Sequence, residues 1–150
     1  MKASLCPECG APLPESGTCR DNFYALLFLE SQIPVGPGER PHFYAVSAYA
    51  LQHPISFNYK AETLQNLRQD LAEVLDGRLT LNQLRQRTRR AANGSVRITR
   101  RPGDPIPDWY NGPWPMNVSD VCAAGVAGYI ETVHQWAQSV QETLSNWIIP

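Results

Sequence analysis

The sequence predicts a mainly α-helical fold, a helical bundle that follows an N-terminal loop and is interrupted by one small β-hairpin excursion. Two segments, 61–75 and 128–147, repeat apolar residues at intervals of three and four, which is the spacing of one helix face. Alternation of apolar and polar residues, which is typical of a strand, is confined to 95–101. We expect residues 1–150 to form a single domain, because this length is usual for one domain and sufficient to bury a core.

Composition divides this predicted domain into four segments. Residues 1–20 are polar and rich in Pro and Gly, without apolar periodicity, so we expect a loop that something other than a core must order. Residues 21–94 are expected to be helical, and residues 95–118 to form the β and loop excursion. Residues 119–150 hold the C-terminal helix.

The first two predicted helices are apolar around most of their circumference. Residues 21–31 contain an almost continuous apolar run at 23–29, which indicates a helix buried on most sides. The second helix runs from about 41 to 52, because Pro41 suits a first helical turn and Pro54 disfavours helical geometry in the residue before it. The modest loop between them favours an antiparallel hairpin of helices.

The next two helices are predicted by amphipathicity and by a capping motif. The third, about 61–75, has leucines on one face and acidic and amide residues on the other, and Gly77 ends it. Thr80 and Gln83 match a capping box, so a short basic helix is expected from there to Asn93.

The C-terminal third combines the excursion with the strongest helical pattern. We expect a strand at 95–101, a proline-rich loop at 101–115 and a second strand at 114–118 that pairs back with the first. The final helix, about 128–147, presents one apolar stripe that must pack on other helices, made of Ile130, Val133, Ala137, Val140, Leu144 and Trp147.

Charge is distributed unevenly, although the net charge is −1. Eight arginines and no acidic residue fall in 78–101, while all 14 acidic residues lie elsewhere. Such a block can neutralise phosphates, so nucleic-acid binding is one hypothesis. A pI near 6.3 and the lack of an aromatic platform favour instead an arginine segment folded against the acidic body.

Neither a membrane span nor a secretory signal is expected. No apolar run approaches the roughly 20 residues that cross a bilayer. The first residues, MKASLCPECG, contain no apolar core of a signal peptide, which predicts a cytoplasmic protein.

Three of the four cysteines lie within the first nineteen residues. Cys6 and Cys9 form the CPECG pattern of a zinc knuckle, in which two thiolates hold one ion and the glycine allows a tight turn. Cys19 is a natural third ligand. A disulfide fits poorly with a chain that lacks a signal peptide, and a redox CxxC would lie between a strand and a helix rather than in a proline-rich loop. We therefore predict a Zn²⁺ site.

The fourth ligand must come from elsewhere in the chain or be water. The candidates are Asp21, His42, His53, Cys122 and His134. In an antiparallel pair of helices, the end of the second lies beside the start of the first, which places His53 near Cys19 and His42 near Glu30. We therefore favour His53 as the fourth ligand. For three of the other candidates we favour roles that do not involve metal binding. We expect His42 to pair with Glu30, Cys122 to be buried and inert, and His134 to be a partly exposed structural residue.

Several segments together resemble a known family. They are CPECGAPLP, DNFYALLFLE, HFYAVSAYALQHP and the tail VSDV…YIETVHQWAQSV, in order from Cys6 to about Val140. The chain resembles an uncharacterised bacterial family, a domain of unknown function with an N-terminal CPxCGA segment and an LQHP step. The resemblance implies a cytosolic, single-domain bacterial protein and no particular activity. Tyr24 stands where many relatives carry histidine, which weakens any hypothesis of a histidine-rich catalytic centre.

Three functions remain open from the residues. The first is a binding or adaptor module with a closed structural zinc site and an unknown protein or small-molecule partner. The second is a zinc hydrolase with water on the metal and Asp21 or Glu30 as base, although three cysteines would make bound water less acidic. The third is nucleic-acid binding through 78–101. No phosphate-binding loop, GxSxG elbow or HExxH motif is present, which excludes the common nucleotide, esterase and zincin classes.

Overall fold

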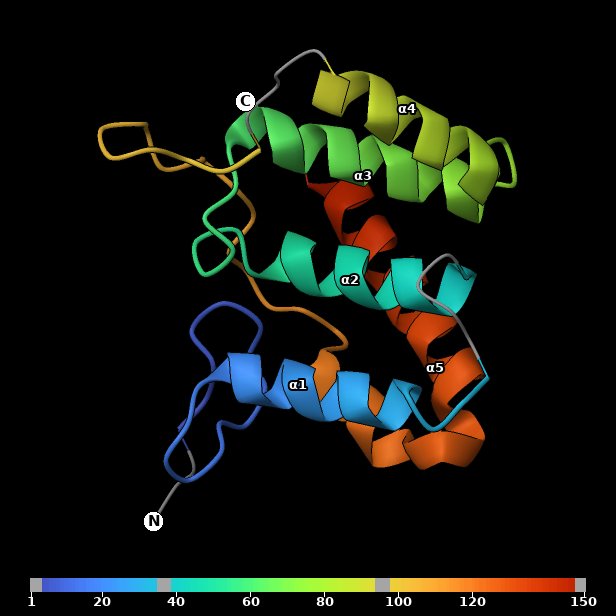
Figure 1. Cartoon of the computed structure of the whole chain (residues 1–150). Helices are drawn as coiled ribbons and strands as arrows, with labels where there is room; N and C mark the ends of the chain where they lie inside the picture. The colour runs from blue at the N-terminus through green and yellow to red at the C-terminus, as the bar shows by residue number, and fades with distance from the viewer. Residues whose placement is uncertain (1–3, 35–38, 94–97, 148–150) are drawn as a thin grey trace.

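The computed structural model describes residues 4–34, 39–93 and 98–147, and most of these residues lie in helices (Figure 1). The mainly α class predicted from the sequence is confirmed. Within the described residues the helices are α1 (Cys19–Glu30), α2 (Arg40–Gln52), α3 (Ala61–Leu75), α4 (Leu81–Asn93) and α5 (Val118–Asn146). None of them is long and apolar enough to cross a membrane.

Local hydrogen bonds explain where several helices begin. The backbone N–H of Thr18 donates to Asp21 Oδ2 at 2.8 Å, at the start of α1. The predicted capping box before α4 is confirmed: the Thr80 N–H donates to Gln83 Oε1 at 2.9 Å, and the Gln83 N–H donates to Thr80 Oγ1 at 3.1 Å. Each bond satisfies a backbone or side-chain group that a bare helix end would leave unpaired.

The start of α5 differs from the sequence expectation. The apolar stripe predicted a helix from about residue 128, whereas α5 begins at Val118 behind an Asn117 cap. Gly125 interrupts it with φ +68° and ψ −171°, so two helical pieces meet at a kink. The earlier piece was missed because the kink breaks the helical register on which the periodicity depends.

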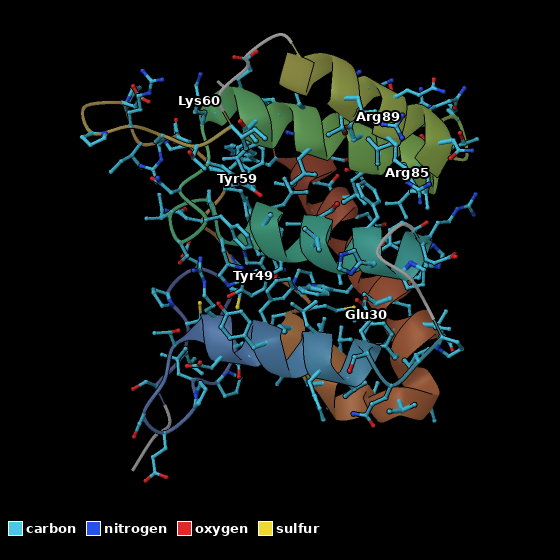
Figure 2. The ribbon with its side chains drawn as sticks, in the orientation of Figure 1. Glu30, Tyr49, Tyr59, Lys60, Arg85 and Arg89 are labelled. Carbon is cyan, nitrogen blue, oxygen red and sulfur yellow. The ribbon has the colours of Figure 1, made fainter. Side chains whose placement is uncertain are left out.

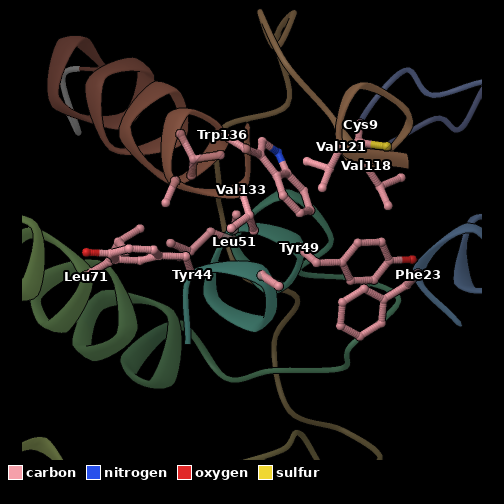
Figure 3. Close-up of a cluster of buried hydrophobic side chains, with 14 of the residues drawn as sticks. Cys9, Phe23, Tyr44, Tyr49, Leu51, Leu71, Val118, Val121, Val133 and Trp136 are labelled. Atoms are coloured by element: carbon pink, nitrogen blue, oxygen red, sulfur yellow. The ribbon is translucent and has the colours of Figure 1, made fainter. Parts of the chain in front are cut away.

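Helix α5 lies across α1, α2 and α3 and supplies the centre of the core (Figure 1). Figure 3 shows Val133 and Trp136 of α5 facing Leu51 of α2, with the neighbouring rings of Tyr49 and Phe23 beside α1. Most of the predicted stripe is buried as expected. Ile130 is 53% exposed because Tyr129 occupies the inward position, and Trp147, directly after the end of α5, is half-buried.

The excursion pairs with a different partner from the one predicted. Thr99 forms an isolated antiparallel bridge with Tyr59, just before α3, rather than with residues 114–118. The Arg100 N–H donates to the Asn58 carbonyl at 2.8 Å. The hairpin prediction was therefore wrong for the described residues, since Val118 already belongs to α5; residues 95–97 lie outside them.

The proline-rich loop before α5 is fixed by its tryptophans. The indole N–H of Trp109 donates to the Leu51 carbonyl at 2.9 Å. The indole N–H of Trp114 donates to the Glu8 carbonyl at 3.1 Å, so this loop ties the amino-terminal segment to the end of α2. Each bond satisfies a buried or half-buried indole N–H that water cannot reach freely.

The arginine segment contacts the acidic body at several points. Arg87 of α4 donates to Asp70 Oδ1 at 2.7 Å and to Glu73 Oε2 at 3.1 Å, both on α3. Figure 2 shows Arg85 and Arg89 on the same helix. The side chains of Arg90 and Arg97 lie outside the described part of the chain.

Candidate metal centre

The amino-terminal cysteines lie on a tight backbone turn. The Cys6 N–H donates to the Ala11 carbonyl at 2.8 Å, and the Gly10 N–H donates to the Cys6 carbonyl at 2.9 Å. Gly10 has φ +84°, a left-handed conformation that glycine adopts without steric cost. The Ala11 N–H also points at Cys9 Sγ, 3.4 Å away. The turn therefore brings Cys6 and Cys9 to one side of the loop, as the CPECG pattern predicts.

The third sulfur comes from the first residue of α1. Cys19 Sγ lies 3.6 Å from Cys9 Sγ, and the Asn22 amide approaches it at 3.9 Å. A thiolate at a helix N-terminus is stabilised by the positive end of the helix dipole. The capping bond between Thr18 and Asp21 fixes this helix end and hence the direction of the Cys19 side chain.

The nitrogen donor comes from the end of α2. His53 is the residue after the last turn, and Pro54 prevents the helix from continuing. Its Nδ1 lies 2.6 Å from the Tyr49 carbonyl oxygen. Because a carbonyl can only accept, Nδ1 carries the proton and the lone pair is left on Nε2. That Nε2 lies 3.6 Å from Cys6 Sγ.

The four donor atoms of Cys6, Cys9, Cys19 and His53 all lie within 4.8 Å of one another. The side chains are buried, with exposed fractions of 5%, 3%, 7% and 0% in that order. They come from segments that are distant in sequence: the loop, the start of α1 and the end of α2. This group could hold a metal ion, and it contains the four residues that the sequence analysis nominated.

Aromatic rings form the wall behind His53. The Tyr49 ring stacks on the imidazole with 3.8 Å between centroids and on Phe23 of α1 with 4.2 Å. Figure 2 shows Tyr49 between α1 and α2, beside the sulfur atoms. Tyr49 therefore orients His53 through two contacts, one from its carbonyl and one from its ring. Metal-binding histidines are commonly oriented in this way by residues that do not themselves touch the metal.

The two neighbouring sulfurs of Cys9 and Cys19 titrate as a pair. The hydrogen bond with Cys9, together with the neighbouring His53, lowers the pKa of Cys19 to about 4, although burial opposes this shift. The same bond and burial raise the pKa of Cys9. Burial and the adjacent Cys19 charge raise the pKa of Tyr49. A bound cation would replace the proton that this pair shares, since metal binding to thiols releases protons.

The other candidate ligands have separate partners. His42 Nδ1 lies 2.7 Å from Glu30 Oε2 at the far end of α1, the pairing that the sequence analysis favoured. Asp21 caps α1. Cys122 is half-buried, with its sulfur 3.8 Å from the Asn22 carbonyl, and burial raises its pKa. The exposed His134 stacks on Tyr44 at 5.2 Å.

Sequence reasoning missed Glu8, the residue between the first two cysteines. Its carboxylate accepts from the Ile55 N–H at 3.0 Å and from the Ser56 hydroxyl, in the turn directly after His53. Arg20 donates to the Ser56 carbonyl of the same turn at 3.3 Å. No sequence signal linked Glu8 to this turn, because the two are 47 residues apart. The contact between Tyr49 and His53 was predictable from the sequence, because residues four positions apart lie on the same face of a helix.

Comparison with known proteins places the chain in a family. No curated protein and no solved structure matches it significantly. Over residues 4–145, which include all four donors, it matches the model of a family of unknown function, DUF5946. The resemblance to an uncharacterised family is thereby confirmed, and the chain belongs to DUF5946.

Proposed function

We propose that the protein is a zinc-binding module in which Cys6, Cys9, Cys19 and His53 hold one structural Zn²⁺ ion. The observation that carries the proposal is the convergence of these four buried donor atoms within 4.8 Å. Three sulfurs and one imidazole nitrogen match the donor preference of zinc, and four protein ligands are the usual complement of a structural site.

A closed coordination shell fits the surroundings better than a hydrolytic centre does. The two carboxylates considered as a catalytic base have other roles, because Asp21 caps α1 and Glu30 binds His42 and Tyr129. Glu30 also lies eleven residues after Cys19 on the same helix, which is about 16 Å along its axis. A base at that distance cannot reach water on the metal.

The metal would join the amino-terminal loop to α1 and α2. The loop buries few large apolar side chains of its own, so metal ligation would supply part of its folding free energy. We propose that the surface formed by the amino-terminal loop, α1 and α2 binds a partner molecule, as a binding or adaptor module in the cytoplasm of a bacterial cell. Nucleic-acid binding is a weaker proposal, because Arg87 is engaged by Asp70 and Glu73, and Arg78 by Asp76.

Metal analysis of the untagged protein tests the proposal. We expect about one zinc ion per chain and X-ray absorption distances of about 2.3 Å for three sulfurs and about 2.0 Å for one nitrogen. Protein without metal would refute the site. An oxygen ligand in place of the nitrogen would refute the closed shell and revive the hydrolase.

Matched variants test the ligand assignment. Cys9→Ser and His53→Gln should lower zinc occupancy, whereas Cys122→Ser should retain it because that sulfur contacts the Asn22 carbonyl instead. Full occupancy in Cys9→Ser would contradict the assignment. The X-ray absorption spectrum of the wild-type protein identifies the atoms bound to zinc independently of any variant. The ligand assignment therefore stays testable if a variant fails to fold.

A further inference from the structure

A surface cleft of about 470 Å³ opens beside the metal centre. Cys6 and Cys19 form part of its wall, together with Thr18, Arg20 and Ser56. Cys9 and His53 do not line this cleft, and all four donor residues are buried. A small molecule that enters the cleft therefore meets the sulfur side of the centre first.

The sulfurs of Cys9 and Cys19 are in direct contact, within a group whose four donor atoms all lie within 4.8 Å of one another. Cys19 Sγ lies 3.6 Å from Cys9 Sγ, whereas Cys6 Sγ lies 3.6 Å from the nitrogen of His53. A disulfide bond requires the sulfurs to approach to about 2 Å, so a pair already in contact needs only a small further movement. The geometry therefore favours a disulfide between Cys9 and Cys19, although Cys6 and Cys9 are closer in sequence.

The wall of the cleft that includes Cys19 also includes one positively charged residue, Arg20. The Arg20 guanidinium is held by the Ser56 carbonyl at 3.3 Å and lies 5.8 Å above the Phe57 ring. The other charged group on the wall is Glu8, whose carboxylate is already bonded to Ile55 and Ser56. Arg20 is therefore the charge available to stabilise an anion that forms at the Cys19 sulfur.

Building on the proposed zinc site, we propose that Cys19 is an oxidation site for hydrogen peroxide, and that its oxidation to a disulfide with Cys9 releases the metal. The Cys19 thiolate attacks one peroxide oxygen, the O–O bond breaks, and hydroxide leaves beside Arg20. The Cys9 thiolate then attacks the resulting sulfenic sulfur and expels a second hydroxide. Two thiolates thus lose two electrons to one peroxide, and solvent protons convert both hydroxides to water. Only Cys6 and His53 then remain as ligands, too few to hold the ion.

Zinc release from the loaded full-length chain tests this inference. Hydrogen peroxide is added in the presence of 4-(2-pyridylazo)resorcinol, which changes absorbance when it binds free zinc, and non-reducing peptide mapping locates the disulfide. We expect loss of the bound zinc together with a Cys9–Cys19 linkage, and rebinding after reduction by dithiothreitol. Oxidation that leaves zinc bound, or that links Cys6 to Cys9, would overturn the inference.

Two variants distinguish an effect of the cleft from general reactivity of the thiols. Arg20→Ala should slow zinc release by roughly a factor of ten, less than the loss of a fully buried oxyanion donor because Arg20 is exposed. Cys122→Ser should release zinc at the wild-type rate. An unchanged rate in Arg20→Ala would overturn the role of the cleft. Protein purified without zinc would refute the proposed function, whereas zinc that resists peroxide would refute this inference alone.

Discussion

Substitution of Tyr129 by phenylalanine should destabilise the fold through a contact that lies far from the candidate metal centre. The Tyr129 hydroxyl donates to Glu30 Oε1 at 2.5 Å, and both side chains are buried. Figure 2 shows Glu30 where α1, α2 and α5 meet. The other carboxylate oxygen is bonded by His42 at 2.7 Å. The substitution therefore leaves one buried carboxylate oxygen without its donor and changes the volume of the core very little.

The magnitude follows from the charge on the acceptor. A hydrogen bond to a charged group contributes about 1.5–3 kcal/mol, so we expect the free energy of unfolding to fall by about 2 kcal/mol. At about 2.1 cal/mol/K per residue, the unfolding entropy of the 150-residue chain is about 0.3 kcal/mol/K. The melting temperature should then drop by about 6 °C.

Urea denaturation and calorimetry of the variant measure both quantities. Tyr24→Phe is the matched control, because Tyr24 is 56% exposed on α1 and its loss should change stability by less than about 0.5 kcal/mol. Equal stability of Tyr129→Phe and wild type would refute the assigned hydrogen bond. A double variant with Glu30→Gln should be less destabilised than the sum of the single changes, since both remove the same interaction.

Two further predictions concern the helices. Gly125→Ala should lower the free energy of unfolding by roughly 1–3 kcal/mol, because φ +68° with ψ −171° is a conformation essentially restricted to glycine; an unchanged urea midpoint would contradict the kink. Burial raises the pKa of Asp70 above its ordinary 3.8, although Arg87 opposes the shift. The folded state therefore binds this proton more tightly, and wild-type stability falls as pH rises through the folded pKa. The stability of Asp70→Asn relative to wild type, measured in urea, should therefore rise as the pH increases from below 3.8; a difference that does not change with pH would contradict the shift.

The helices and the donor set were predictable because both depend on short patterns. The capping box at Thr80 and the proline boundaries of α2 are local signals. The antiparallel hairpin of α1 and α2 then placed His53 near Cys19 and His42 near Glu30, and the structure has both arrangements.

What could not be predicted depends on contacts between distant segments. The strand partner of Thr99 is Tyr59, and nothing in either segment distinguishes it from the nearer residues 114–118. The early start of α5 was concealed by the change of register at Gly125. Ile130 and Tyr129 are adjacent apolar residues, and only the packing of α5 on α1 decides which one is buried.

The bond between the Trp114 indole and the Glu8 carbonyl has a consequence for biosynthesis. It joins residues 106 positions apart, and the contact between Cys6 and His53 spans 47 positions. A ribosome therefore exposes three thiols before it makes the histidine, and it makes the tryptophan later still. Contacts of such long range form slowly, since the intervening chain must first be ordered. We therefore expect the amino-terminal loop, although it is synthesised before the helices, to complete its native contacts only after Trp114 has been made.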